Sequence, residues 1–235
     1  MEMPKLLLLP GLLNDATLYE QLVVKLADVA DCAVGDITRS DSVASLAEEV
    51  LAQAPETPFV LVGMSMGGYV ALEIMRRSPE RVRALALLDT SAHPDTAEAI
   101  AGREELIRKG KEDFPGVIKT LLPRMAHPDH ADLPEVGGAF QSMAVSLGYE
   151  VFVRQQKAII GRPDSRPSLS AIRCPALVLC GADDALTPPA LHRELAAGIA
   201  GARLEIIEEC GHLSPLEQPE KVEAILRDWL ASLPA

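Results

Sequence analysis

Short apolar runs recur along the chain, and the stretches between them carry apolar residues at helical spacing. Apolar runs bounded by turn residues predict buried strands, whereas apolar residues three and four positions apart predict amphipathic helices. We expect strands at about 5–9, 32–37, 59–63, 84–89, 175–180 and 203–208. The helical spacing predicts helices at about 17–30, 42–54, 69–78, 189–200 and 217–233.

The apolar runs lack a polar face, and strand alternates with helix. This combination is typical of a parallel sheet covered by helices on both faces. Between Pro94 and Ser168 the alternation stops, and we find only helical patterns, at about 98–109, 117–125, 136–147 and 150–160. We therefore predict an α/β fold with a mostly parallel six-stranded sheet. Its core would comprise residues 1–93 and 169–235, with residues 94–168 inserted as a helical cap.

The third predicted strand is followed at once by Gly63-Met64-Ser65-Met66-Gly67. A G-x-S-x-G sequence between a strand and a helix is the signature of a nucleophile elbow, a tight turn that exposes a serine hydroxyl. The helix that follows directs its N-terminal N–H groups and positive dipole end at the same point. Ser65 is therefore our candidate nucleophile.

A serine hydroxyl needs a base, and that base needs an acid to orient it. His212 follows the last predicted strand, so it lies at the carboxyl edge of a parallel sheet, as Ser65 does. We expect it to be the base. His93 also follows a strand and could line the pocket. We place the remaining histidines on the surface and predict no metal site; these are His127, His130 and His192.

Candidates for the acid follow two neighbouring strands. Asp183 and Asp184 follow the fifth strand, and Asp89 follows the fourth, where it could instead cap a turn. The intermediate of acyl transfer also needs donors for its oxyanion. We expect these to be the backbone N–H groups of Met66 and of Leu12, which lies in the loop after the first strand.

The predicted cap would cover the site and select the substrate. Its apolar residues either face the substrate or form the cap's own core; the candidates are Leu121, Met125, Phe140, Met143 and Phe152. The side chains of Leu12 and Met66 would lie on either side of the nucleophile.

Composition limits the classes of partner. A net charge of −12 without a basic cluster argues against nucleic acid and anionic membranes. Four cysteines without C-x-x-C spacing predict buried, reduced thiols and a cytoplasmic protein, and the interrupted apolar run of residues 6–13 does not resemble a signal peptide. The oligomeric state, a homo-oligomer included, is left open.

Four motifs together resemble the α/β-hydrolase superfamily. They are Leu9-Pro10-Gly11-Leu12, the elbow, Gly181-Ala182-Asp183-Asp184 with Thr187-Pro188, and Gly211-His212 with Glu217-Gln218-Pro219. The resemblance is greatest to small cofactor-free members such as carboxylesterases, enol-lactonases and the menaquinone-pathway lyase of this fold. It implies a Ser65–Asp184–His212 triad and no cofactor. Two features depart from the family: Pro10 replaces a common histidine, and the sheet is shortened to six strands.

Three functions are compatible with these residues. The first is hydrolysis of a small ester, thioester or lactone acyl substrate through an acyl-enzyme on Ser65. The second is a lyase or C–C bond reaction in which Ser65 and His212 act as a base, which would need a cationic pocket. The cap arginines could supply it: Arg103, Arg108, Arg124, Arg154 and Arg162. The third is a binding module without turnover.

Overall fold

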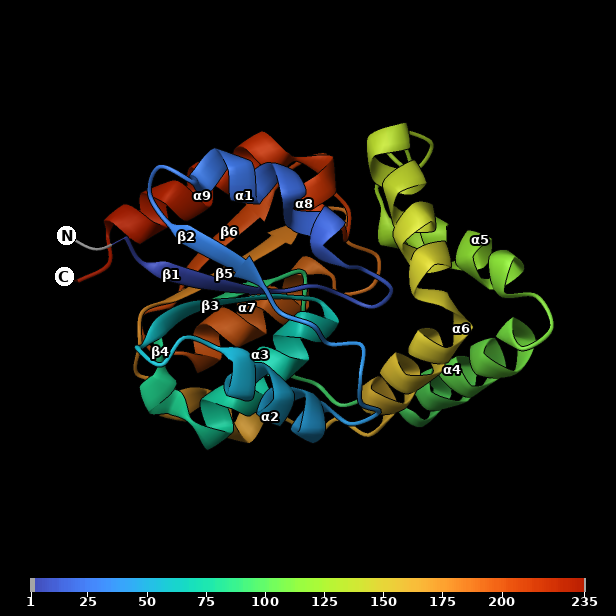
Figure 1. The fold of residues 1–235 in the computed structure, drawn as a ribbon, viewed down its shortest axis with the longest axis horizontal. Coiled ribbons are helices and arrows are strands. Elements are labelled where there is room, and N and C mark those ends of the chain that lie inside the picture. Colours follow the sequence, from blue (N-terminus) through green and yellow to red (C-terminus); the bar gives the residue numbers. More distant parts are fainter. Residues whose placement is uncertain (1–2, 235) are drawn as a thin grey trace.

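The computed structural model describes residues 3–234. A six-stranded sheet forms the centre of the molecule (Figure 1). All neighbouring strands are parallel, in the order β2-β1-β3-β4-β5-β6, which confirms the predicted sheet. The strands are β1 (Lys5–Leu9), β2 (Asp31–Val34), β3 (Phe59–Met64), β4 (Val82–Leu88), β5 (Ala176–Gly181) and β6 (Arg203–Ile207).

Helices cover both faces of this sheet, as the uninterrupted apolar strands require. On one face lie α1 (Glu20–Leu26), α8 (Ser214–Glu217) and α9 (Pro219–Ala231). On the other lie α2 (Val43–Gln53), α3 (Met66–Arg77) and α7 (Pro189–Gly198). Every residue of β3 and β5 is buried, whereas the edge strands β2 and β6 are only partly buried. The core therefore lies along the middle of the sheet.

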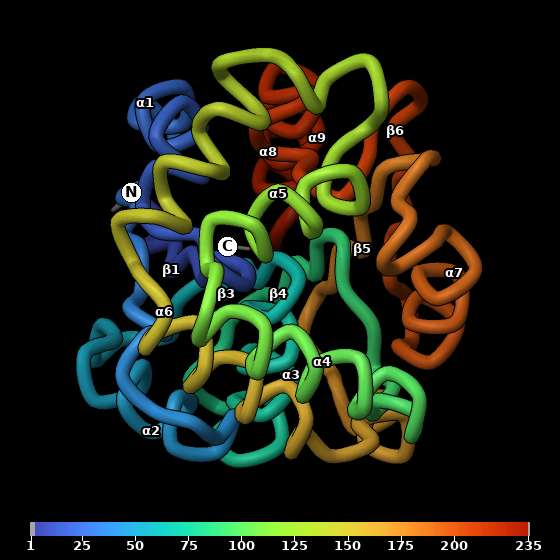
Figure 2. The backbone as a smooth tube through the Cα atoms, turned by 90° about the vertical axis from the view of Figure 1, so that its right-hand side faces the viewer, coloured from blue at the N-terminus to red at the C-terminus, as the bar shows by residue number. Residues whose placement is uncertain are grey.

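The chain between β4 and β5 is helical and contains α4 (Ala97–Gly110), α5 (Phe114–Met125), the π-helical turn η3 (Pro134–Gly138) and α6 (Ala139–Ile160). Figures 1 and 2 show these helices beyond the ends of the central strands rather than on a face of the sheet. Helix α6 is kinked at Gly148, where φ is 78° and ψ is 173°. The kink falls between the two helices predicted at 136–147 and 150–160.

Some predicted boundaries were wrong for local reasons. The helix expected at 17–30 begins as the 3-10 turn η1 (Ala16–Tyr19), because Asp15 accepts a hydrogen bond from Thr17 N, and α1 ends at Leu26. The strand expected at 32–37 ends at Val34. The last predicted helix is divided into α8 and α9 at Gln218, whose φ of −136° is not helical, and Pro219 begins α9. The remaining turns are η2 (Pro79–Arg81) and η4 (Arg166–Ala171).

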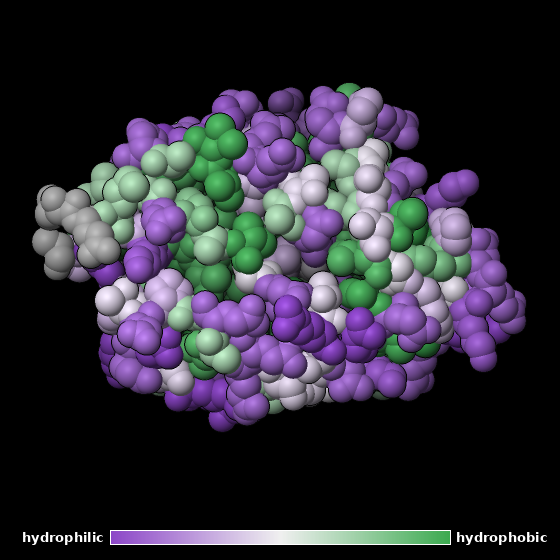
Figure 3. All heavy atoms as spheres, viewed as in Figure 1, coloured by the Kyte–Doolittle hydropathy of each residue, from purple (hydrophilic) through white to green (hydrophobic). Residues whose placement is uncertain are grey.

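On the face shown in Figure 3, hydrophilic residues predominate around the rim, and apolar residues gather in patches between them. No helix within residues 3–234 is long and apolar enough to cross a membrane. All four cysteines are free; Cys180 and Cys210 are buried as expected, whereas Cys32 and Cys174 are only partly buried. Burial raises the pKa of the Cys32 thiol to about 11, so this thiol is a poor nucleophile at neutral pH.

Candidate active site

Ser65 occupies a strained turn between β3 and α3. Its φ is +53°, a value that few residues other than glycine adopt. Ser65 N donates to Leu88 O at 2.9 Å, and Thr90 Oγ1 donates to Ser65 O at 2.7 Å, so both ends of the residue are held by β4 and the loop after it. A Cβ at Gly67 would lie 2.2 Å from Leu9 O, so only glycine allows α3 to approach β1 here. The predicted elbow therefore has the geometry that its motif requires.

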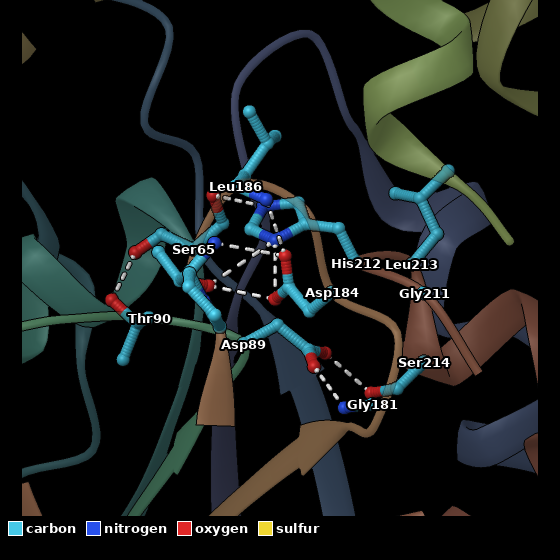
Figure 4. A network of polar contacts seen from close by, with 12 residues as sticks. Ser65, Asp89, Thr90, Gly181, Asp184, Leu186, Gly211, His212, Leu213 and Ser214 are labelled. Atoms are coloured by element: carbon cyan, nitrogen blue, oxygen red, sulfur yellow. Dashed lines mark hydrogen bonds and ion pairs between the residues drawn. The ribbon is translucent and has the colours of Figure 1, made fainter. Parts of the chain in front are cut away.

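Three side chains from distant parts of the chain form one hydrogen-bonded line (Figure 4). His212 Nε2 lies 2.8 Å from Ser65 Oγ, and His212 Nδ1 lies 2.8 Å from Asp184 Oδ2. Because the strands are parallel, the loops after β3, β5 and β6 meet at one edge of the sheet. The structure thus brings together the three residues that the sequence motifs selected.

Asp184 accepts more hydrogen bonds than the one from His212. Leu186 N and Thr187 N each donate to Oδ1 at 2.8 Å, and Thr187 Oγ1 donates to Oδ2 at 2.7 Å. Burial by itself would raise the pKa of this carboxyl. The charge and hydrogen bond of His212, together with the Thr187 donors, outweigh burial and hold the Asp184 pKa below its ordinary value. Asp184 is therefore a carboxylate.

Burial has the opposite influence on His212, because it disfavours the charged imidazolium. The imidazole is 1 % exposed, and burial alone would lower its pKa. The Asp184 carboxylate outweighs burial through its charge and its hydrogen bond, so the His212 pKa lies above its ordinary value. An imidazole that is stabilised when protonated is suited to accept a proton from Ser65.

Glu217 holds the loop that carries His212. Its carboxylate accepts hydrogen bonds from Gly211 N and Leu213 N, both at 2.9 Å, so it fixes the backbone on either side of His212. The same carboxylate accepts from His127 N at 2.9 Å and lies 3.0 Å from His130 Nδ1. This role of Glu217 was not predicted from the sequence, although its spacing after His212 within one of the motifs was the available signal.

Asp89, the alternative acid, lies beside the triad but does not bond to His212. Its Oδ1 accepts from Gly181 N at 3.1 Å, and its Oδ2 accepts from Ser214 Oγ at 2.5 Å (Figure 4). Complete burial and the nearby Asp184 carboxylate raise its pKa well above the ordinary value. The structure therefore pairs His212 with Asp184 rather than with Asp89. Asp183 is the other alternative. Its Oδ2 lies 3.8 Å from His127 Nε2, and its side chain is half exposed.

The two residues predicted to form the oxyanion hole lie next to Ser65 from opposite directions. Met66 is the first residue of α3. On the other side, a Cβ at Gly11 would lie 3.2 Å from Ser65 Cβ, so this glycine lets the loop after β1 approach closely, and Leu12 follows it. Leu12 and Met66 are both buried. Their roles as donors and as substrate contacts stay predictions.

The remaining histidines differ from the prediction of a surface location. His192 is fully buried: its Nε2 accepts from Thr90 N at 2.8 Å, and burial lowers its pKa to about 4. His127 and His130 are mostly buried against the loop of His212. His93 pairs with Glu194 at 2.6 Å, not with Ser65. Within residues 3–234, no group of three or more His, Cys, Asp or Glu side chains could hold a metal ion.

The apolar cap candidates are largely buried. Met125, Phe140 and Met143 are each at most 2 % exposed, and Met143 Sδ accepts a hydrogen bond from Asp15 N at 3.4 Å. Leu121 is partly buried, and Phe152 packs against Phe114 with ring centroids 5.4 Å apart. Contact of these residues with a substrate stays a prediction.

Comparison with known proteins identifies the family. A model of the alpha/beta hydrolase family matches residues 6–225. The chain belongs to the α/β hydrolase family. The chain is 29% identical to a pimeloyl-[acyl-carrier protein] methyl ester esterase of Neisseria meningitidis serogroup C, over 78% of this chain and 74% of the relative. It is 31% identical to the putative carbamate hydrolase RutD of Klebsiella pneumoniae, over 85% and 77% of the two chains.

A solved structure supports the same assignment. This α/β hydrolase resembles a thermophilic esterase from Thermogutta terrifontis, solved with malate bound, with a TM-score of 0.89 and 30% identity. The match covers 100% of this chain and 91% of that esterase. Because its relatives are named as esterases and hydrolases, the chain is an enzyme of this family and a hydrolase.

Proposed function

We propose that this α/β hydrolase cleaves a small carboxylic ester, thioester or lactone through an acyl-enzyme on Ser65. The observation that carries the proposal is the unbroken hydrogen-bonded line from Ser65 Oγ through His212 to Asp184. Each contact is within hydrogen-bonding distance, so no rearrangement is needed before the serine is activated.

In the first half of the reaction, Ser65 Oγ attacks the substrate carbonyl carbon while its proton passes to His212 Nε2. The carbonyl oxygen becomes negative and accepts hydrogen bonds from the N–H groups of Leu12 and Met66. The intermediate then collapses, and the departing alcohol or thiol takes the proton from His212. The product of this half is an ester between the acyl group and Ser65.

In the second half, a water molecule gives its proton to His212 and attacks the acyl carbon. The bond to Ser65 Oγ breaks, the serine recovers the proton, and the carboxylic acid leaves. In both halves Asp184 keeps the imidazole oriented and stabilises its positive charge without taking up a proton itself. Its depressed pKa supports this role.

The experiment that tests the function uses a fluorophosphonate, which reacts with activated serines. We expect labelling of the wild type and none of Ser65→Ala, together with hydrolysis of short-chain p-nitrophenyl esters by the wild type only. Equal labelling of the two proteins, or an unlabelled wild type, would show that Ser65 is not the nucleophile. A panel of acyl chain lengths would then define the substrate.

The cap arginines argue against the lyase alternative, which needs a cationic pocket. Arg103 and Arg162 both pair with Asp95, and Arg162 also donates to His93 O. Arg108 pairs with Glu105, Arg154 donates to Thr38 O, and Arg124 is exposed.

The intact triad argues against a binding module. A small-molecule partner and a cytoplasmic location remain part of the proposal.

A further inference from the structure

The loop after β1 has a backbone shape that needs external support. This loop, residues 10–15, carries Leu12, whose N–H is one of the two proposed oxyanion donors. The next residue, Leu13, has a φ of +56°. This value lies in the left-handed region, which is energetically unfavourable for a residue with a bulky side chain. Such a conformation persists only where neighbouring groups hold it.

Gln155 of α6 holds the Leu13 backbone. Its Oε1 accepts a hydrogen bond from Leu13 N at 2.9 Å, across 142 residues of sequence. Its Nε2 donates to Ile37 O at 3.3 Å. The side chain is completely buried, so water cannot replace either partner. Because one end of the amide must accept and the other must donate, the two bonds fix its orientation.

A second contact reaches the same loop from the other half of α6. Met143 Sδ accepts from Asp15 N at 3.4 Å. Met143 and Gln155 lie on either side of the kink at Gly148, whose φ of 78° and ψ of 173° are open essentially only to glycine. The kink thus lets two separate turns of one helix contact residues 13 and 15 of the loop.

The other side of Leu12 is held by the core. Tyr19 OH donates to Leu9 O at 3.0 Å, and Gly11 packs against Ser65. The peptide that carries the Leu12 N–H therefore lies between a segment held by the core and a peptide held by Gln155. The direction of the Leu12 N–H depends on both.

We propose that Gln155 is a positioning residue for catalysis: it orients the loop of residues 10–15 so that the Leu12 N–H points at the oxyanion formed on Ser65. The proposal rests on the hydrolase function given above and makes α6, a helix of the cap, part of the machinery that stabilises the transition state. Both ends of the buried Gln155 amide are bonded, whereas within residues 3–234 the Nε2 of the adjacent, equally buried Gln156 has no hydrogen-bond partner.

The first test compares Gln155→Met with Gln156→Met. Gln156 is the adjacent residue, equally buried, and bonds to Arg103 instead of the loop, so it is a matched control. We expect Gln155→Met to lower kcat by about 10- to 100-fold with KM changed less than about threefold, because a misdirected donor weakens transition-state binding. Gln156→Met should retain kcat. Equal losses in the two variants, or an unchanged kcat in Gln155→Met, would overturn the proposal.

A second variant keeps the shape of the amide and adds a proton that can be removed. In Gln155→Glu, a protonated carboxyl can accept from Leu13 N and donate to Ile37 O, whereas a carboxylate has no proton for Ile37 O. Burial raises the pKa of such a carboxyl towards neutrality. The ratio of kcat in the variant to kcat in the wild type should be near one at low pH and fall as pH rises. A ratio that does not change with pH would contradict the positioning role.

A binding measurement separates this inference from the proposed function. Phenylboronic acid forms a tetrahedral adduct with an active-site serine and places an oxygen where the oxyanion would lie. We expect Gln155→Met to weaken its binding by about tenfold or more and Gln156→Met to leave it unchanged. If the wild type binds the boronate but cleaves no ester, the hydrolase proposal fails, and this comparison still decides the role of Gln155. Unchanged binding in Gln155→Met would overturn it.

Discussion

Two buried aspartates follow neighbouring strands at the same edge of the sheet, yet their environments differ. Asp184, after β5, receives two backbone N–H groups, the Thr187 hydroxyl and the His212 imidazole. Asp89, after β4, receives one backbone N–H and the Ser214 hydroxyl. The pKa of Asp184 is lowered, whereas that of Asp89 is raised well above its ordinary value.

The difference shows what a catalytic carboxylate needs besides a place near the histidine. Burial alone disfavours the charged form of either group. Asp184 accepts from four donors, one of them an imidazole that can carry positive charge, and its pKa is lowered; Asp89 accepts from two, and its pKa is raised. Asp89 instead connects the ends of β4 and β5 to the loop after His212, through Gly181 N and Ser214 Oγ. The same type of side chain thus bonds to the proposed catalytic histidine in one loop and connects strands in the next.

The largest expected effect follows from removing the charge of Asp184. We expect Asp184→Asn to lower kcat/KM by about 10⁴-fold, because the amide favours the wrong imidazole tautomer. The His212 pKa, which Asp184 raises, should fall, so the acid limb of the activity profile should move to lower pH. Measuring kcat/KM between pH 5 and 9 tests both effects. A loss below about tenfold would transfer the acid role to Asp89.

His192, which accepts a hydrogen bond from Thr90 N in the loop after Asp89, provides a test of stability at low pH. Buried His192 has a pKa of about 4, below that of the unfolded chain, so the unfolded chain binds one more proton between pH 4 and 6.5. As the pH falls from 6.5 to 4, the wild type should lose on the order of 3 kcal/mol of unfolding free energy because of His192. His192→Gln keeps an acceptor for Thr90 N and should remove that loss.

Urea unfolding at several pH values would measure this difference, with His93→Gln as the control because His93 is partly exposed and contacts Glu194. We expect the control to follow the wild type. Parallel pH profiles of the wild type and His192→Gln would mean that His192 does not resist protonation in the folded state.

A smaller effect is expected when Asp184 loses one of its donors. Thr187→Val preserves shape but removes the hydroxyl that bonds Asp184 Oδ2 at 2.7 Å. The Asp184 carboxylate should become less stable and less well oriented, and kcat/KM should fall by about tenfold. Thr120→Val, an exposed threonine of α5, is the control. A variant as active as the wild type would show that the remaining donors suffice.

The smallest effect on activity is expected for Asp89→Asn, which should leave kcat/KM within about threefold of the wild type. Its effect on stability has a definite sign. Folded Asp89 retains its proton to higher pH than the unfolded chain, so wild-type stability falls as pH rises above the unfolded pKa. The variant lacks this cost. The unfolding free energy of the variant minus that of the wild type should therefore rise with pH. A large loss of activity would give Asp89 a catalytic role.

Much of the fold was predictable because its signals are local. The apolar runs identify β1 and β3 to within one residue, and glycines mark the elbow. The strand order β2-β1-β3-β4-β5-β6 was not predicted, because the alternation of strand and helix does not show which strands are neighbours. The boundaries that failed depend on single groups, such as the Asp15 cap and Pro219.

The site was predictable to the extent that it follows from topology. Loops after parallel strands converge, so Ser65 and His212 could be placed together without coordinates. The sequence could not show that His192 is buried, that Glu217 fixes the loop of His212, or that Gln155 reaches Leu13. Each is a contact between segments distant in sequence, and distant pairing leaves no periodic pattern in either segment.

By itself, then, the sequence determined the sheet, the strained serine and the set of residues from which a triad could form. Local sterics and strand periodicity are properties of neighbouring residues, so both can be recognised without knowing how the rest of the chain folds. Only the tertiary structure decided which aspartate bonds to His212 and has the lowered pKa, and which helix supports the loop carrying Leu12. Those outcomes depend on how many donors surround each buried group, and folding alone brings those donors together.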